Sequence, residues 1–207
     1  MFERLDNKYV VREAVLRQAL PELARHFDIL EMDGKRAFTY ETCYFDDEQR
    51  TNYFDHHRRR RQRFKVRIRS YTDAGLCFVE VKLKDKRGIT VKKRMRYAPE
   101  KYGVLDGDAL AHVRAAYREL YGREFAGELV PSISMRYRRM TLVARRGGER
   151  MTIDRGLVFT GATGSRAIDD EVFIIETKSA NANGIADKIL RGAKPGEISL
   201  AHNGVLF

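Results

Sequence analysis

Cationic and apolar side chains alternate along the segment Gln62 to Tyr71, which reads QRFKVRIRSY. Successive side chains of a strand point to opposite faces, so a strand here would have one cationic face and one apolar face. The cationic face would carry Arg63, Lys65, Arg67 and Arg69. Like charges at this spacing repel one another, and a solvated face usually has acids among them. The pattern indicates a polyanionic ligand, and the open alternative is a solvated basic strand.

Three further groups of polar side chains share strand faces in the same way. They are Glu80 with Lys82 and Lys84, then Arg150 with Thr152, Asp154 and the neighbouring Arg139, then Glu176 with Lys178. Guanidinium groups match the geometry of phosphate oxygens, and a carboxylate such as Glu176 could hold Mg²⁺ or Mn²⁺. Each group alone is explained as well by a surface salt-bridge ladder or by a strand end in water. Taken together, these explanations would require four or five strands of one domain to carry cationic faces by chance.

Several other chemistries lack their sequence signals. The chain has no P-loop, no glycine-rich dinucleotide turn, no HExxH and no GxSxG. His56 and His57 open the run HHRRRR, which we expect to be an exposed, mobile connection. That run could contact nucleic acid, but few aromatic residues interleave with it and no helix-turn-helix or RNP-like motif is present. No nucleic-acid partner is therefore expected.

The elements that must position these side chains are mostly strands. Hydrophobic periodicity predicts helices at 10–26, 106–121 and 183–191, with Asp106 or Asp108 capping the second. Alternation predicts strands at 38–46, 62–71, 76–85, 89–97, 132–145, 149–159 and 170–178. Short turns join 62–71, 76–85 and 89–97 into an antiparallel meander, in which Lys93 interrupts the apolar side of the last strand. The fold class is α+β, and the sheet is either a barrel with its charged faces inward or an open sheet with that face in water.

Composition narrows the class of protein. A chain of 207 residues with 43% hydrophobic content can bury a core, and we expect residues 1–207 to form a single domain. The net charge of +11 favours anionic partners. No apolar run is long enough to span a membrane, and the charged N-terminus does not fit a signal peptide. Cys43 and Cys77 have no metal-ligand spacing, so we expect reduced thiols and a cytoplasmic protein.

Eight short motifs, in order along the chain, resemble those of the VTC domain. This is the polyphosphate polymerase domain of the vacuolar transporter chaperone complex, and it belongs to the triphosphate tunnel metalloenzymes. The motifs are RLDNKY at 4–9, TCYFD at 42–46, RIRSY at 67–71, EVK at 80–82, KKR at 92–94, YRR at 137–139, RMTID at 150–154 and ETK at 176–178. Each motif is weak alone, but eight in order with suitable intervals are a specific signal.

The resemblance implies an antiparallel β-barrel tunnel with flanking helices that binds a triphosphate in its lumen. The side chains that would contact phosphates are Lys8, Arg67, Arg69, Lys82, Lys92, Arg94, Arg139, Arg150 and Lys178. Of these, the residues expected to act in catalysis are Arg67, Arg69, Lys82, Arg139 and Arg150. Glu176 would ligate Mn²⁺ or Mg²⁺. The γ-phosphoryl group of ATP would pass to inorganic phosphate or to a polyphosphate chain, and ADP would leave.

One position departs from the family pattern. Family members usually end with an S-K-Y-like segment whose lysine reaches the tunnel, whereas Leu200 follows Ser199 here, and Lys194 is the nearby lysine that could replace it. Two alternatives therefore stay open within the same fold. Water could be the acceptor, which would make the protein a tripolyphosphatase or nucleoside triphosphatase, or the protein could be a non-catalytic polyphosphate-binding module.

Overall fold

The computed structural model describes residues 5–193 and the backbone of Ser199–Leu200. Arg4 of the first motif and Lys194, the lysine near Leu200, lie outside the described residues, as does the side chain of Leu200. The described residues group into two compact units. Unit 1 takes the described parts of Met1–Phe38, Tyr137–Leu157 and Ala167–Leu206, and unit 2 takes Thr39–Arg136 and Val158–Arg166. The expectation of a single domain over 1–207 stays a prediction.

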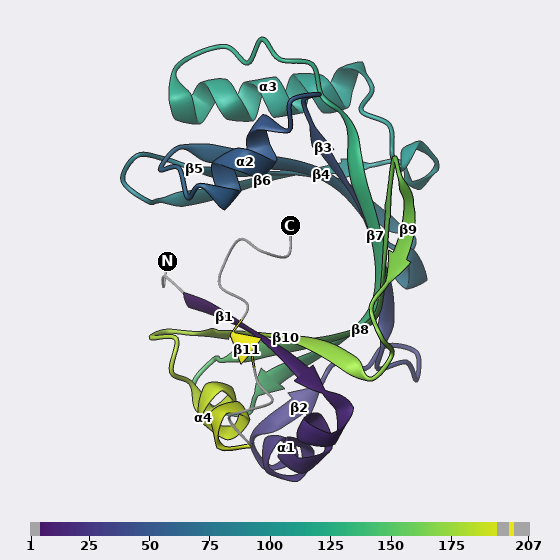
Figure 1. Cartoon of the computed structure of the whole chain (residues 1–207), viewed down its shortest axis with the longest axis vertical. Coiled ribbons are helices and arrows are strands. Elements are labelled where there is room, and N and C mark those ends of the chain that lie inside the picture. Colours follow the sequence, from purple (N-terminus) through teal and green to yellow (C-terminus); the bar gives the residue numbers. More distant parts are fainter. Residues whose placement is uncertain (1–4, 194–198, 201–207) are drawn as a thin grey trace. The chain divides into compact units, whose positions relative to one another are not determined.

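Unit 1 is an antiparallel sheet with two helices. Its elements are β1 (Leu5–Arg12), α1 (Glu13–His26), β2 (Phe27–Ile29), the second part of β7 (Val130–Ala144), the first part of β8 (Arg150–Gly161), β10 (Val172–Ser179), α4 (Ile185–Gly192) and β11 (Ser199–Leu200). The strand order is β11-β1-β10-β8-β7, and β2 also pairs with β7. In Figure 1, α1 and α4 lie next to each other against these strands. They cover the apolar face, where Val15 and Leu23 of α1 pack with Tyr9 and Ile175 of the sheet.

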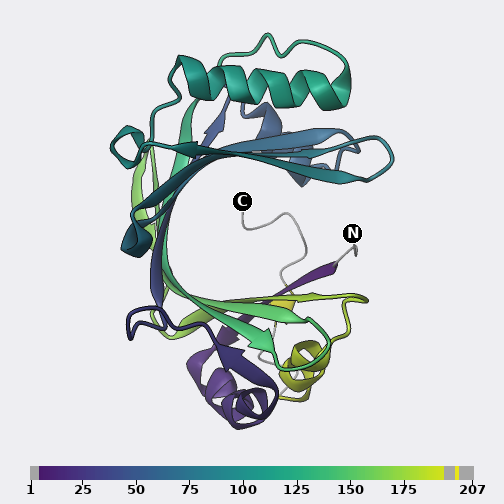
Figure 2. The ribbon, with the colours of Figure 1, turned by 180° about the vertical axis from the view of Figure 1, so that it is seen from behind.

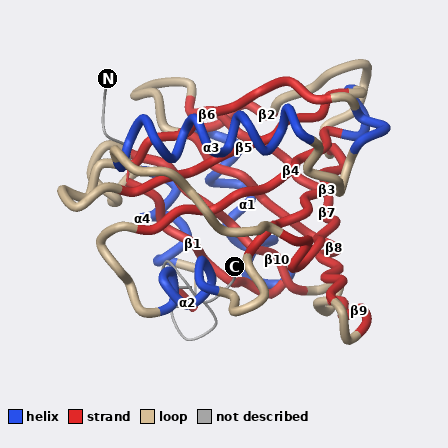
Figure 3. Tube along the Cα trace, turned by 90° about the horizontal axis from the view of Figure 1, so that it is seen from above, coloured by secondary structure: helices blue, strands red, loops and turns tan. Residues whose placement is uncertain are grey.

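Unit 2 repeats this design with other strands. Its elements are β3 (Phe38–Asp46), α2 (Thr51–His57), β4 (Arg63–Tyr71), a 3-10 turn (Thr72–Ala74), β5 (Leu76–Lys84), β6 (Thr90–Tyr97), a second 3-10 turn (Pro99–Lys101), α3 (Gly107–Tyr121), the first part of β7, the end of β8 and β9 (Gly164–Ala167), which pairs with β8. The strand order is β7-β3-β4-β5-β6. Figures 2 and 3 show α3 lying over β5 and β6. Val113 and Tyr117 of α3 pack there on Val79 and Val81.

Local sequence explains where these helices begin. Asp106 accepts a hydrogen bond from the Ala109 N–H (2.9 Å) and caps α3 as predicted, and Gly122 ends it with φ 66°. The helix predicted at 10–26 begins only at Glu13. Residues before it belong to β1, because Tyr9 and Val11 alternate into the core while their backbone pairs with β10. Val11 of β1 lies four residues before Val15 of α1, so its helical spacing is a coincidence.

The HHRRRR run is only in part the exposed connection that the sequence suggested. Its two histidines form the last turn of α2; His56 is half-buried, whereas His57 and residues 58–61 after it are exposed. Asp46 at the end of β3 organises this helix: its carboxylate accepts hydrogen bonds from the backbone N–H groups of Asn52 and Tyr53 (both 2.9 Å). Because this capping carboxylate comes from β3, the residues of the short helix carry little sequence signal of their own.

The structure confirms the α+β fold class with an antiparallel sheet. The predicted meander is also confirmed, since β4 pairs with β5 and β5 pairs with β6 in the antiparallel sense. In the described part of the chain, the hydrogen-bonded strand path runs from β11 to β6 and those two strands are its ends. None of the described helices is long and apolar enough to cross a membrane. In each unit the apolar face packs on helices, which leaves the charged face for chemistry.

Candidate phosphate-binding site

Unit 2 carries a strip of cations on the face of β4, β5 and β6 opposite the apolar one. We call it the cationic strip; it consists of Arg63, Lys65, Arg67, Arg69, Lys82, Lys84, Lys92, Arg94 and Arg96. The register aligns like charges across the strands, because Lys82 lies directly opposite both Lys65 and Lys92. Directly opposed like charges destabilise a sheet. Among the side chains on this face of the three strands, Glu80 is the only acid.

Glu80 ties two of these cations together. Its side chain is 1% exposed; its Oε2 accepts a hydrogen bond from Arg67 Nε (2.7 Å) and forms an ion pair with Arg67 Nη2 (2.6 Å), and its Oε1 accepts a hydrogen bond from Lys92 Nζ (2.6 Å). Burial alone would raise the pKa of Glu80, but the charge of Arg67 and the hydrogen bond from Lys92 outweigh burial and lower the pKa to about 2. Glu80 is therefore an ionised counterion that fixes where Arg67 and Lys92 point.

Strand β3 orients the two arginines at the centre of the strip. Arg67 Nη1 donates to Tyr44 Oη (3.1 Å), and Arg69 Nε donates to Thr42 Oγ1 (3.1 Å). Arg69 is 8% exposed. Burial would raise the pKa of the Tyr44 phenol, but the charges of Arg67 and Arg69 lower it to about 8. Both predicted phosphate-binding arginines are thus held in place by hydroxyl groups.

The other predicted cations of unit 2 are more open to solvent. Lys82, Lys92 and Arg94 are exposed, and the Arg94 guanidinium stacks 3.4 Å from the centre of the Phe78 ring. Lys93 leaves this face altogether: its Nζ pairs with Glu119 of α3 at 2.7 Å. The lysine that interrupts the apolar pattern of β6 is therefore matched to an acid on the covering helix.

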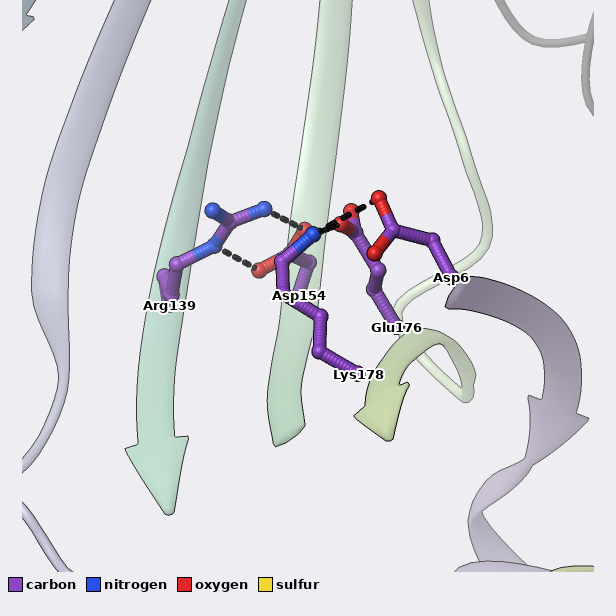
Figure 4. Close-up of polar contacts among 5 residues, drawn as sticks. All are labelled: Asp6, Arg139, Asp154, Glu176 and Lys178. Atoms are coloured by element: carbon purple, nitrogen blue, oxygen red, sulfur yellow. Dashed lines mark hydrogen bonds and ion pairs between the residues drawn. The ribbon is translucent and has the colours of Figure 1, made fainter. Parts of the chain in front are cut away.

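Unit 1 carries a second group of charges, on the face of its strands opposite the buried Tyr9 and Ile175. Figure 4 shows five of these side chains. Arg139 of β7 and Asp154 of β8 form a bidentate pair, with Nε–Oδ1 at 2.6 Å and Nη2–Oδ2 at 2.7 Å. Lys178 of β10 donates to Asp6 Oδ2 of β1 (2.8 Å) and to Glu176 Oε1. Side chains from four strands therefore meet on one face.

Register adds the remaining predicted residues of unit 1 to this group. Lys8 of β1 lies opposite Glu176, and Arg150 of β8 lies opposite Lys178. Burial alone would raise the pKa of Glu176, but the charges of Lys178 and Lys8 outweigh it and lower the pKa to about 2. Thr152 lies opposite Glu176 on β8, and its Oγ1 is buried with no hydrogen-bond partner among the described residues.

These side chains fit a divalent metal that is shared with a ligand. Glu176 is ionised, a second carboxylate from Asp6 lies beyond Lys178, and oxygen ligands suit Mg²⁺ and Mn²⁺. No cluster of three or more ligating side chains occurs in the part of the chain that the structure describes. Mg²⁺ is commonly held by one or two carboxylates, with waters and substrate phosphates completing its shell. In this structure Glu176 is the counterion of Lys178.

Sequence reasoning underrated three residues of these groups. Asp154 was grouped with its neighbours on β8, but its bidentate pair with Arg139 depends on the β7–β8 register. In the sequence, Tyr44 is marked only by the TCYFD motif. The alternation of Tyr40, Thr42 and Tyr44 with the apolar Cys43 and Phe45 is the signal that places Tyr44 on the polar face of β3. Asp6 stands in the RLDNKY motif, but its contact with Lys178 follows from pairing between strands distant in sequence.

Comparisons with known proteins agree with this description. Residues 3–200 match the family described as the VTC domain. A solved structure of a putative adenylyl cyclase from Hippeastrum, described as having a dominant triphosphatase activity, is 13% identical, with a TM-score of 0.54 over 94% of this chain and 88% of that chain. A weaker likeness, to a putative adenylate cyclase from Bacillus halodurans, has 11% identity and a TM-score of 0.47 over 93% of this chain and 86% of that chain. No match was found among curated proteins. The first likeness concerns the fold, and it agrees with the predicted triphosphate tunnel type.

Proposed function

Because the chain belongs to the VTC domain family, we propose that it is a metal-dependent phosphotransferase that makes polyphosphate from ATP. The γ-phosphoryl group would pass to inorganic phosphate or to the end of a polyphosphate chain, and ADP would leave. The observation that carries this proposal is the cationic strip, in which one buried acid accompanies nine cations. Such a face is stabilised by a polyanion with closely spaced charges.

The residue roles follow from the contacts within each unit. In unit 2, Arg67 and Arg69 are oriented by hydrogen bonds and would clamp phosphate oxygens, while Lys82, Lys92 and Arg94 would add charge at the more open side. In unit 1, Arg139 is held by Asp154, and Lys8, Arg150 and Lys178 share its face. Phosphoryl transfer needs little covalent help from protein, so positioning and charge neutralisation are the main contributions expected from these side chains.

Glu176, with Asp6 nearby, would hold Mn²⁺ or Mg²⁺ together with phosphate oxygens. A divalent cation there would neutralise charge that develops on the transferred group. The protein's own part is to keep Glu176 ionised, which Lys178 and Lys8 achieve.

A second candidate is a triphosphatase that uses the same side chains with water as acceptor. Two observations favour it: the fold likeness to the Hippeastrum protein described as having a dominant triphosphatase activity, and Leu200 at the position of the family lysine. A polyphosphate-binding module without turnover is the third candidate. Transfer and hydrolysis differ in the fate of the phosphoryl group, so product analysis separates them.

The test is to incubate the purified protein with ATP and Mn²⁺ or Mg²⁺ and to quantify polyphosphate, ADP and free phosphate separately. The proposed polymerase predicts one ADP for each phosphate unit added to the acceptor phosphate or chain. Free phosphate that matches ADP, with no polymer, would assign the protein as a hydrolase. Polyphosphate binding without turnover, under conditions where ATP and metal are saturating, would leave only the binding module.

A further inference from the structure

A small cavity of about 60 Å³ lies beside the cationic strip in unit 2. Tyr44 and Lys65 form part of its wall; Lys65 belongs to the strip, and Tyr44 lies opposite Arg67 of the strip. Tyr44 Oη accepts the hydrogen bond from Arg67 Nη1 at 3.1 Å. The side chain of Tyr44 therefore connects the cavity wall to Arg67, a predicted phosphate-binding residue.

Much of the wall of this cavity is poorly suited to binding phosphate. Phe45, Val66 and Ile133 supply apolar surface, which gains nothing from contact with a phosphate oxygen. Asn52, which is 7% exposed, supplies a polar group at the same wall. An amide presents both donors and an acceptor, which are the groups that the polar edge of a heterocycle pairs with. Apolar surface with a few placed polar groups is typical of sites for small organic ligands.

An aromatic side chain stands at the cavity with much of its surface open. Tyr53 lines it and is 47% exposed, although large apolar rings gain from burial. Its ring lies nearly parallel to that of His57, with an interplanar angle of 9° and 6.1 Å between centroids. Exposed aromatic rings next to a cationic groove are surfaces on which nucleobases stack.

The helix that carries Asn52 and Tyr53 is fixed to the sheet. Asp46 accepts the backbone N–H groups of both residues at 2.9 Å, and Asp46 itself is 4% exposed. α2 contacts β4, and burial together with the charges of Lys65 and Arg63 lowers the pKa of His56, on the same helix, to about 3. The cavity wall is thus held in position before any ligand arrives.

We propose that this cavity receives the base of a nucleoside triphosphate whose phosphates lie on the cationic strip. A cavity of about 60 Å³ admits only an edge of the base, and the exposed ring of Tyr53 covers part of the remaining face. The proposal rests on the proposed function and deepens it, because it makes the protein select a nucleoside triphosphate over inorganic tripolyphosphate. Inorganic tripolyphosphate has no apolar part and would use the strip alone.

Two ligands and three variants test this. Binding of ATP and of tripolyphosphate is measured by calorimetry for the wild type, Tyr53→Ala, Asn52→Ala and the control Phe54→Ala. Phe54 is on the same helix and is 39% exposed, but it does not line the cavity. Loss of one base-stacking contact weakens binding roughly tenfold. We expect Tyr53→Ala to weaken ATP binding by about this factor, Asn52→Ala to weaken it less, and neither to change tripolyphosphate binding.

Other outcomes overturn the inference in distinguishable ways. Unchanged ATP binding in both cavity variants, or an equal loss for ATP and tripolyphosphate, would remove the base site while leaving the proposed function intact. The same loss in Phe54→Ala would attribute the effect to α2 as a whole and would also contradict the proposal. If the wild type bound neither ligand, the proposed function itself would fail.

Discussion

Glu80 is the residue on which the cationic strip depends. Its ionised carboxylate holds Arg67 and Lys92, so Glu80→Gln leaves both cations without their buried counterion. We expect the free energy of unfolding of this variant to be about 3 kcal/mol lower than that of the wild type at pH 7. Glu119→Gln is the control, since Glu119 is 64% exposed in its pair with Lys93 and such pairs contribute little.

The pH dependence of this difference is fixed by the direction of the pKa shift. The pKa of Glu80 is about 2 in the folded chain and 4.5 when unperturbed. A lowered folded pKa contributes stability that is complete above pH 4.5 and is lost as the pH falls toward 2. Urea unfolding of wild type and Glu80→Gln between pH 7 and pH 3 should show the gap between them closing with acid. A gap that stays constant would mean that the Glu80 charge is not what stabilises the fold.

Glu176 tests the metal role at a single carboxylate. Glu176→Ala should abolish the increase in ATP turnover with Mn²⁺ or Mg²⁺ concentration, while tripolyphosphate binding without metal persists because the cations remain. Turnover is measured over a metal titration, and Glu171→Ala, an exposed acid just before β10, is the control. A metal response equal to that of the wild type would remove Glu176 from metal binding.

Elements were predictable from the sequence where their signals are local. The β4–β5–β6 meander and α3 follow from alternation, short turns and a capping aspartate, and the structure places them within one or two residues of the expected bounds. The short α2 escaped detection because its stabilising acid, Asp46, comes from β3. The ion pairs of Glu176 and Asp154 escaped for a related reason, since they depend on which strands pair and in which register. The two faces of a strand can be inferred from its own sequence, but contacts between strands depend on which strands pair and in which register.

The start of α4 gives a prediction at the scale of an element. Glu149 accepts the backbone N–H groups of Ile185 (2.8 Å) and Ala186 (3.0 Å), so its carboxylate lies against Gly184. A Cβ at Gly184 would fall 2.2 Å from Glu149 Oε1. Gly184→Ala should therefore displace Glu149 and lower the free energy of unfolding by roughly 1–3 kcal/mol. The measurement is denaturant unfolding.

Gly107→Ala, at the start of α3, is the matched control for that substitution. A Cβ at Gly107 would meet no atom within 4 Å. We expect this variant to be neutral or slightly stabilised, since alanine reduces the freedom of the unfolded chain. Equal destabilisation of both variants would show that the loss comes from the glycine backbone and not from the contact with Glu149.

At the scale of the molecule, the two units have separate hydrophobic clusters. Leu23 of α1 is fully buried in one cluster, and Val113 of α3 is fully buried in the other. Leu23→Ala, which costs about 2–5 kcal/mol, should speed backbone hydrogen exchange in α1, β1 and β10 and change β4 to β6 much less. Val113→Ala should give the reverse pattern. An equal rise across both units in either variant would mean that the chain unfolds as one cooperative body.

The alignment of Lys65, Lys82 and Lys92 across three strands has a consequence for handling the purified protein. Folding brings these ammonium groups together, and an anion that binds only the folded strip relieves that repulsion. The melting temperature should therefore depend on which salt the buffer contains, and be higher in phosphate than in chloride at equal ionic strength. Dialysis into an anion-poor buffer would then be a mild denaturing step, and the polyanion would serve the protein as a folding aid as well as a substrate.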